Sequence, residues 1–495
     1  MYRKLQNAEG PPKDFQLPFE GQLSAENRWV ILSKLIPWYE FESEYADYFS
    51  SEMGAPAKSF RMALGALIIK EKLGTSDRET VEQIRENPYL QYFIGLESYQ
   101  DAPPFDASML VHFRQRISAE LLGKINKSMV KKGRGFQKES PEKKPPEKGG
   151  GGGKNRGKLL MDATVAPADI KYPTDVDLLN TVRKDMERII DKMHAQRQGT
   201  GEKKPRTDRK QARKAYLKFA KNKKKSRKER IKATQKQLKY VKRNLEHIEK
   251  LIEKGVSLEC LSHREYRRLL VGAEIYRQQQ EMVDNQKSRV NNRIVSVSQP
   301  HVRPIVRGKA GAQTEFGAKI SVSCCNGYAF VERISWENYN ESGDLKMQVE
   351  AYKDLTGYYP ESIHADKIYR NRENRKWCKE RGIRLSGPPL GRPPKNVSKE
   401  QKIQEREDER IRNAVEGKFG QGKRRFSLGR VMTKLAQTSE TSIALTFLVM
   451  NLEKLLRQFY CPFLCSFFPN RTFWRQAIRI NYRNLSCSRG SLMFR

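Results

Sequence analysis

The sequence predicts a mixed α/β fold whose sheet is preceded by one helical segment and interrupted by another. Residues 158–165 form an apolar run, typical of a buried strand, with a single carboxylate inside it. Residues 316–336 hold two strand-like runs on either side of Asn326-Gly327, a strong signal for a hairpin turn. Between these strands, from about 178 to 292, nearly every residue favours a helix. These three observations predict a sheet with a long helical insertion.

The helical segment before the sheet shows apolar side chains at helical spacing, separated by short polar joints. Ser76 or Asp77 can cap the helix after one joint, and Asp106 or Ser108 the helix after another. Short helices with tight joints suit a DNA-binding module of the helix-turn-helix kind. An ordinary small helical bundle would show the same pattern.

A flexible linker is predicted over residues 131–157. It contains Pro145-Pro146 and the glycine run 149–153, and it has few apolar side chains to bury. It marks the end of the helical N-terminal domain, which we place at residues 1–130.

After the first strand, strand and helix patterns alternate, as expected for a mixed sheet. The insertion has so few apolar residues that we interpret it as an extended helical hairpin rather than a globular core. The other expected strands are 316–323, 328–336, 362–366 and 383–385, and the expected helices are 345–352, 372–381 and 400–458, the last broken near 419–430.

The charge of the chain points to nucleic acid as a partner. Lys and Arg number 96 and Asp and Glu 58, a formal net charge of +38, which repels itself unless an anionic partner neutralises it. Residues 203–243 hold twenty Lys and Arg against Asp208 and Glu229, so this stretch alone carries 20 − 2 = +18. We expect it to follow the phosphate backbone, with a solvated basic surface as the alternative. The candidate contacts are Lys210, Arg213, Lys214 and Lys224.

Cysteine, histidine and hydropathy patterns exclude several other classes of protein. Neither the seven cysteines nor the six histidines have the spacing of a zinc site, and an odd cysteine count argues against a secreted disulfide framework. The strongest apolar run, 443–450, is too short to span a bilayer, and residues 1–21 lack a signal-peptide pattern. We expect a soluble cytoplasmic protein without a membrane partner.

Two aspartates stand on strand patterns that we expect to be adjacent. Asp162 lies in the first strand run, and Asp366 ends the run 362–366. Ligands gather at the carboxyl ends of strands in such sheets. Two carboxylates there, joined by a glutamate from a packed helix, would form the all-oxygen site that Mg²⁺ prefers. An aspartate at a strand end is also a common turn or cap residue.

The helical segment 410–425 supplies the third acid. It contains Arg412, then Glu416 four positions later, then Lys423 seven positions after that. This spacing resembles the Tyr-x2-Arg-x3-Glu-x6-Lys signature of the DDE insertion-sequence transposases. Glu409 stands where the signature has tyrosine, a departure from the family pattern.

The resemblance continues in the expected order along the chain. Residues 160–164 look like the strand of the first family aspartate, and residues 365–369 look like the segment of the second, with Ile368 in the place of a common glycine. The N-terminal block, including residues 87–93, is similar to the domain that accompanies these enzymes. The similarity covers roughly residues 20–456, apart from the basic insertion.

The resemblance implies a role for each residue of the signature. Asp162, Asp366 and Glu416 would be catalytic and would bind Mg²⁺, with Mn²⁺ able to substitute. Arg412 and Lys423 would contact phosphates beside the scissile bond. Water would cleave the end of the element, and the exposed 3′-hydroxyl would attack target DNA without ATP. The implied partners are double-stranded DNA, at the element ends and the target, and a second copy of the chain on that DNA, in the nucleoid.

The resemblance also implies the remaining domain boundaries. A ribonuclease H-like catalytic domain would span 158–458 and contain the basic helical insertion, about 178–292. Residues 459–495 form an aromatic and basic tail, expected in a core or an interface, with stacking on bases as the alternative. Two other functions stay open: a catalytically decayed transposase that only binds DNA, and a nuclease that cuts without joining.

Overall fold

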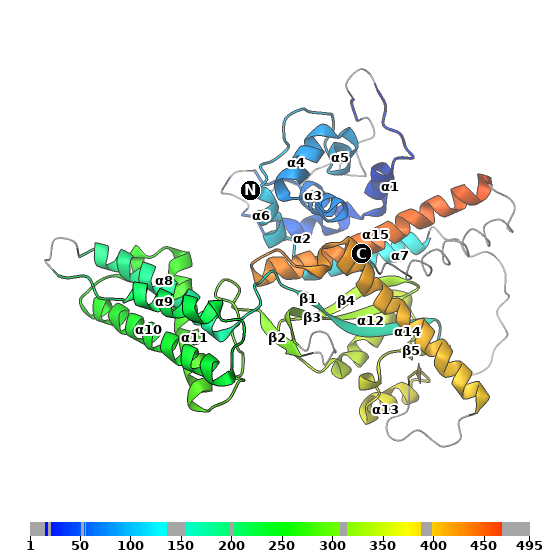
Figure 1. Cartoon of the computed structure of the whole chain (residues 1–495). Coiled ribbons are helices and arrows are strands. Elements are labelled where there is room, and N and C mark those ends of the chain that lie inside the picture. The colour runs from blue at the N-terminus through cyan, green and yellow to red at the C-terminus, as the bar shows by residue number, and fades with distance from the viewer. Residues whose placement is uncertain are drawn as a thin grey trace, which may run out of the picture.

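The computed structural model describes residues 15–17, 21–50, 54, 56–135, 155–197, 202–306, 314–387 and 398–467. A central sheet with its covering helices carries a helical unit above it, built from the N-terminal part, and a second helical unit at its side (Figure 1). The mixed α/β class predicted from the sequence is confirmed.

Short helices form the N-terminal unit, as predicted. Ser76 caps α4 by accepting a hydrogen bond from the backbone N–H of Glu79 at 3.1 Å, and Asp106 accepts one from the N–H of Ser108 at 2.8 Å. The elements are α1 (Arg28–Leu35), the 3₁₀ helix η2 (Trp38–Phe41), α2 (Glu42–Ala46), α3 (Phe60–Leu73), α4 (Asp77–Glu86), α5 (Pro88–Phe93), α6 (Met109–Arg116) and α7 (Ala119–Gly135).

The sheet is mixed and has six strands among the described residues. One edge of β3 pairs with β1 and the other with β4 and β2, all antiparallel, whereas β1, β5 and β6 pair in parallel. Asn326 and Gly327 join β3 to β4 with φ angles of 49° and 75°, the positive pair that the predicted tight hairpin requires. The strands are β1 (Lys158–Pro167), β2 (Arg303–Val306), β3 (Thr314–Cys325), β4 (Tyr328–Ser335), β5 (Ser362–His364) and β6 (Arg384–Leu385).

Helices from before and after the hairpin cover the sheet. α7 and α15 both pack on β4, and in Figure 1 they lie between the sheet and the N-terminal helices. α14 packs against β1 and β5, and one hydrophobic cluster joins the N-terminal helices to the sheet. These elements are η4 (Glu341–Asp344), α12 (Leu345–Thr356), η5 (Lys367–Tyr369), α13 (Arg372–Glu380), α14 (Lys399–Arg425), η6 (Ser427–Gly429) and α15 (Ala436–Phe467).

The insertion is a packed helical unit, so the prediction of an extended hairpin without a globular core is wrong. Apolar side chains of α8, such as Val182 and Met186, meet the sparse stripe of α10, including Val241 and Ile248, in a buried cluster of their own. Each helix contributes a narrow row of apolar side chains, and a core forms only when the helices pack together. The elements are α8 (Asp175–Ala195), α9 (Arg209–Lys221), α10 (Arg227–Glu253), η3 (Leu258–Cys260) and α11 (His263–Asp284).

The predicted linker begins too early. Residues 131–135 are the last turn of α7. Met129 and Val130 are buried, and Gly133 lies so close to the Leu455 side chain of α15 that a Cβ atom there would be 2.5 Å from it. This packing extends the helix past the two lysines that suggested its end. The proline and glycine runs of the predicted linker lie outside the described residues.

Two further boundaries differ from the prediction. α14 runs unbroken to Arg425, through three glycines, because Phe419 and Gly422 are buried, Gly422 against Leu428 and Met450. The interruption lies at 426–435 instead of 419–430. α15 continues past 458 to Phe467. At the start of the predicted tail, the Tyr460 hydroxyl donates to the carbonyl of Glu26, as expected for an interface, and residues 468–495 lie outside the described residues.

A membrane-spanning segment is also absent from the described part of the chain. None of its helices combines the length and the apolar character needed to cross a bilayer.

Candidate active site

The register of the sheet aligns the two candidate aspartates. β1 and β5 pair in parallel with Leu160 opposite His364, an offset of 364 − 160 = 204. Continuing this offset by two residues places Asp162 level with Asp366, since 366 − 162 is also 204. Asp162 in β1 and Asp366, two residues past the end of β5, therefore lie at the same end of the β1–β5 pairing.

Asp162 lies inside β1, within the apolar run predicted around it, and not at the carboxyl end of the strand. β1 continues to Pro167 because its other edge stays paired with β3 over that whole length. Asp162 lies two residues past the last β1 residue that pairs with β5. Asp366 does follow the end of β5, as predicted, and its carboxylate accepts a hydrogen bond from the N–H of Lys367 at 2.7 Å.

Burial raises the pKa of Asp162 to about 6. A hydrogen bond from the N–H of Ala163, at 2.8 Å, and the charge of Arg412 both oppose this shift. The charges of Glu341 and Asp366 add to it, which places both carboxylates close to Asp162. Negative charge is thus concentrated at this point of the sheet.

Glu416 lies on α14, the helix that packs against β1 and β5. Its carboxylate forms an ion pair with Arg412 at 3.2 Å, and the Glu416 side chain is 55% exposed against 26% for Arg412. Because Arg412 also lowers the pKa of Asp162, its guanidinium connects the aspartate to the glutamate. Lys423 lies half-buried about 10 Å further along the same helix, away from the carboxylates.

Two side chains beside Asp162 were not predicted from the sequence. Glu341 of η4 forms an ion pair with Lys319 of β3 at 2.7 Å. Tyr369 of η5 is fully buried, and its pKa is raised by that burial and by the charges of Glu341 and Asp162. Glu341 precedes a predicted helix, where an acid ordinarily caps, so its sequence position gave no signal of the site.

The donor set suits a hard divalent cation in its chemistry. Carboxylate oxygens are the ligands that Mg²⁺ and Mn²⁺ prefer, and a cation would offset the negative charges of Glu341 and Asp366 that act on Asp162. Among the described residues, however, no three acidic, histidine or cysteine side chains lie together as a metal-binding group. The structure brings Asp162 and Asp366 together and leaves Glu416 paired with Arg412.

We expect Asp162→Asn to stabilise the metal-free protein at pH 7 by on the order of 2 kcal/mol. Because the pKa is about 6 in the fold and 3.8 as the ordinary value, the folded protein binds this proton more tightly. The unsubstituted protein therefore loses stability as pH rises from about 4 to about 6, and the variant does not. Urea unfolding between pH 4 and 8 with EDTA measures the difference, and parallel curves for the two proteins would contradict it.

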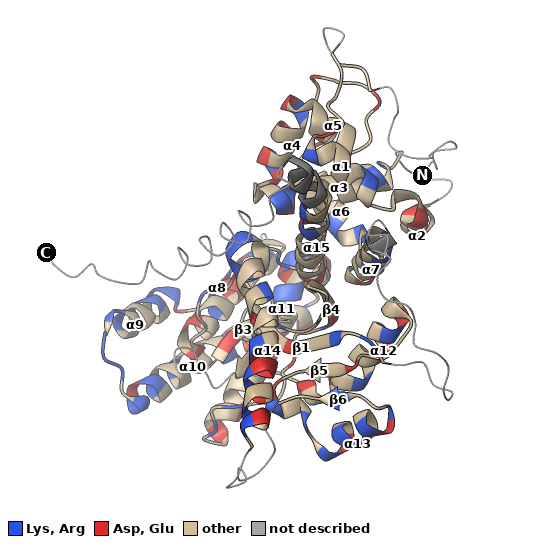
Figure 2. Ribbon diagram, turned by 90° about the vertical axis from the view of Figure 1, so that its right-hand side faces the viewer, with Lys and Arg blue, Asp and Glu red and all other residues tan. Residues whose placement is uncertain are grey.

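The four basic candidates lie on the insertion, apart from the carboxylates. Lys210, Arg213 and Lys214 are exposed on α9, and Lys224 is exposed in the turn between α9 and α10. Figure 2 shows Lys and Arg along α9 and through this turn, on the side of the insertion away from the sheet. The structure therefore separates two sets of residues, an acidic one at the sheet and a basic one on the insertion.

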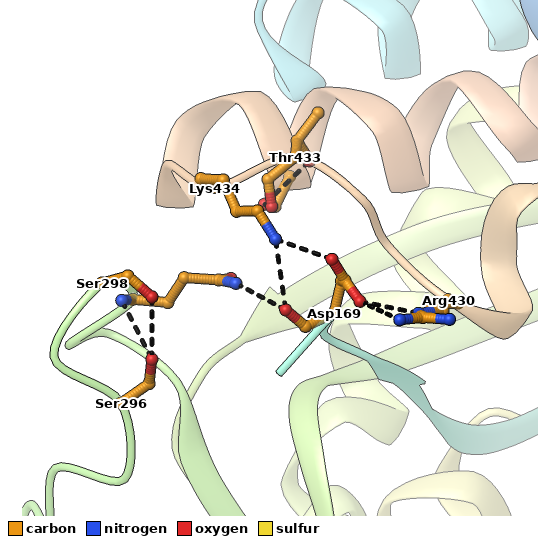
Figure 3. A network of polar contacts seen from close by, with 8 residues as sticks. Asp169, Ser296, Ser298, Arg430, Thr433 and Lys434 are labelled. Atoms are coloured by element: carbon orange, nitrogen blue, oxygen red, sulfur yellow. Dashed lines mark hydrogen bonds and ion pairs between the residues drawn. The ribbon is translucent and has the colours of Figure 1, made fainter. Parts of the chain in front are cut away.

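A polar network attaches the insertion to the sheet (Figure 3). Asp169, just after β1, forms ion pairs with Lys434 at 2.7 Å and with Arg430, and hydrogen bonds from these cations hold its pKa below the ordinary range. The Gln299 side chain, on the chain returning from the insertion, donates to the Asp169 carbonyl at 3.0 Å. The two connections of the insertion are thus tied to each other and to the segment before α15.

Two family models match the chain. One described as a transposase DDE domain matches residues 363–453, which include Asp366 and Glu416, and one described as a transposase domain, DUF772, matches residues 17–116 of the N-terminal unit. A Rhizobium meliloti protein named uncharacterized protein ORF8 in nfe locus is 32% identical over 146 residues, which are 30% of this chain and 64% of the relative. No solved structure matches. The chain is thus similar to a transposase N-terminal domain and to a transposase DDE domain, in the order predicted from the sequence.

Proposed function

We propose that the protein cleaves DNA at the ends of an insertion sequence and joins them to target DNA in a metal-dependent reaction. The observation that carries this proposal is that Asp162 and Asp366 lie at the same end of the β1–β5 pairing, with Glu416 on the adjacent helix. The family matches support it, because one of them covers the second aspartate and the glutamate.

The sheet supports a ribonuclease H-like catalytic domain over 158–458. Antiparallel β3 and β4 precede a helix and the parallel strands β5 and β6, and the first aspartate stands on the central β1. In this proposal the basic insertion, about 178–292, interrupts the domain. The helices up to Gly135 form the DNA-binding unit, and α15 extends to Phe467.

Asp162, Asp366 and Glu416 are the proposed catalytic residues and ligands of Mg²⁺, or of Mn²⁺. Divalent ions held there would activate the attacking oxygen and stabilise the leaving one. Arg412 pairs with Glu416, and its charge acts on Asp162, so its guanidinium can bind an anionic phosphate that approaches these carboxylates. Lys423 extends the positive charge along the same helix.

The partner is double-stranded DNA, as both element ends and target. The insertion offers a sequence-tolerant surface for it, because phosphate contacts position a duplex without reading its bases. Two ends must be held at once, so we propose a homodimer on nucleoid DNA.

Cleavage of a plasmid that carries the element's own flanking DNA tests the proposal. With Mg²⁺ or Mn²⁺, the unsubstituted protein should cut at the element ends and yield joined products, and Asp366→Ala should do neither at equal DNA binding. Cutting without joined products would favour a nuclease of the same fold. Equal cleavage by the variant would rule out the carboxylate site.

Two observations favour a second candidate, a decayed transposase that only binds DNA. Glu409 replaces the tyrosine of the signature, and the described residues hold no group of three metal ligands. Tight DNA binding by both proteins without cleavage by either would support this candidate.

A further inference from the structure

The position of Glu416 depends on how helix α14 is placed. Asp162 and Asp366 follow the paired residues of β1 and β5 by two positions each, whereas Glu416 is a largely exposed side chain on a helix. Its ion pair with Arg412 lies within that helix, so it does not fix the helix against the sheet. Any contact that sets the rotation of α14 therefore also sets the direction of Glu416.

A carboxylate two turns before Glu416 makes such a contact. The residues from 399 to 407 are exposed, but the Asp408 side chain is only 8% exposed. A buried carboxylate is costly unless it is paired and hydrogen-bonded. Arg384 of β6 donates two hydrogen bonds to Asp408, at 2.7 and 2.9 Å, and Gln404 donates a third at 3.1 Å.

This contact joins α14 to the strands beside the second aspartate. Arg384 is on β6, which pairs in parallel with β5, and the Nδ1 atom of His364 on β5 lies 3.5 Å from an Asp408 oxygen. Asp366 follows His364 by two residues. A planar guanidinium with two parallel bonds to a carboxylate tolerates little rotation.

The rotation of α14 at Asp408 also determines the position of Glu416, because both residues are on this helix. Asp408, Arg412 and Glu416 follow at steps of four, so they lie on one side of α14, with Glu416 about 12 Å beyond Asp408. A rotation of α14 by about 30° would move a side chain on its surface by about 3 Å. That shift is enough to remove an oxygen from a shared ligand position.

We infer that Asp408 and Arg384 are positioning residues that set the rotation of α14 against the sheet and thereby the direction of the Glu416 side chain. The inference rests on the proposed metal-dependent function. It adds two residues outside the Arg-Glu-Lys signature, and they act through Glu416 without touching the reacting atoms.

Direct measurement of Mn²⁺ binding, by calorimetry without DNA, tests the inference. Asp408→Asn removes the negative charge that pairs with Arg384. Arg384→Lys keeps the positive charge but loses the two parallel hydrogen bonds of the guanidinium. Glu407→Gln, the control, removes an exposed charge one residue away. We expect both positioning variants to bind Mn²⁺ about tenfold more weakly and to cleave more slowly, as supporting partners of metal ligands do. The control should bind Mn²⁺ like the unsubstituted protein.

Thermal unfolding of each variant separates positioning from loss of the fold. Unchanged Mn²⁺ affinity in folded Asp408→Asn and Arg384→Lys would overturn the inference. If Asp408→Asn does not fold, Arg384→Lys decides. A failure of the unsubstituted protein to bind Mn²⁺ would instead overturn the proposed function, and with it the inference, so the two failures are distinguishable.

Discussion

Glu416→Gln should lower the rate of metal-dependent DNA cleavage by about a thousandfold or more while leaving DNA affinity largely unchanged. Loss of one metal-binding carboxylate removes several kcal/mol of transition-state stabilisation, and about 1.4 kcal/mol corresponds to a tenfold change in rate. The substitution also frees Arg412, but an exposed ion pair contributes little to stability, so the fold should persist. Single-turnover cleavage of the element-end plasmid measures the rate.

Glu416 is the most informative of the three acids to test, because the structure leaves it outside any group of metal ligands among the described residues. Glu407→Gln, on an exposed turn of the same helix, serves as the control and should cleave at the unsubstituted rate. Full activity of Glu416→Gln would mean that another carboxylate completes the site. Glu341 is then the first to examine, since its charge acts on Asp162.

The strands and the place of the second aspartate could be predicted because local patterns determine them. An apolar run and an Asn-Gly turn fix where β1, β3 and β4 begin and end. The position of Asp162 relative to the end of the β1–β5 pairing could not be predicted in this way. It depends on β3 pairing along the full length of β1 while the pairing with β5 ends at Leu160. The sequence of one strand does not show how long its neighbouring strands are.

The helices show the same division between local and tertiary information. The sequence of α14 contains three glycines, which predict a break, yet buried contacts of Phe419 and Gly422 hold the helix together. The core of the insertion was missed because each helix has few apolar side chains on one face. These side chains become buried only when α8 and α10 pack together. Glu341 and Tyr369 were missed for a related reason, since only the fold brings them to Asp162.

Replacing Lys210, Arg213, Lys214 and Lys224 by glutamine should flatten the salt dependence of DNA binding. If each contacts one phosphate, the slope of log affinity against log salt should fall by about 0.9 per contact, or roughly 3 to 4 in all. Between 50 and 200 mM salt, the unsubstituted protein should then lose on the order of a hundredfold more affinity than the variant. Fluorescence anisotropy with a duplex of arbitrary sequence measures the slope, because phosphate contacts do not read bases.

The same basic stretch contains the matched control, because four of its cations form ion pairs with aspartates of the chain. Asp191 and Asp208 accept ion pairs from them, at 2.6 to 2.8 Å. These cations are Lys204, Arg206, Arg209 and Arg243. Their replacement by glutamine removes the same formal charge. It should lower the unfolding free energy, and it should change the salt dependence of DNA binding less than the first fourfold variant does. Equal slopes for the two fourfold variants would mean that only net charge matters, and an unchanged slope in the first would exclude α9 as a phosphate-binding surface.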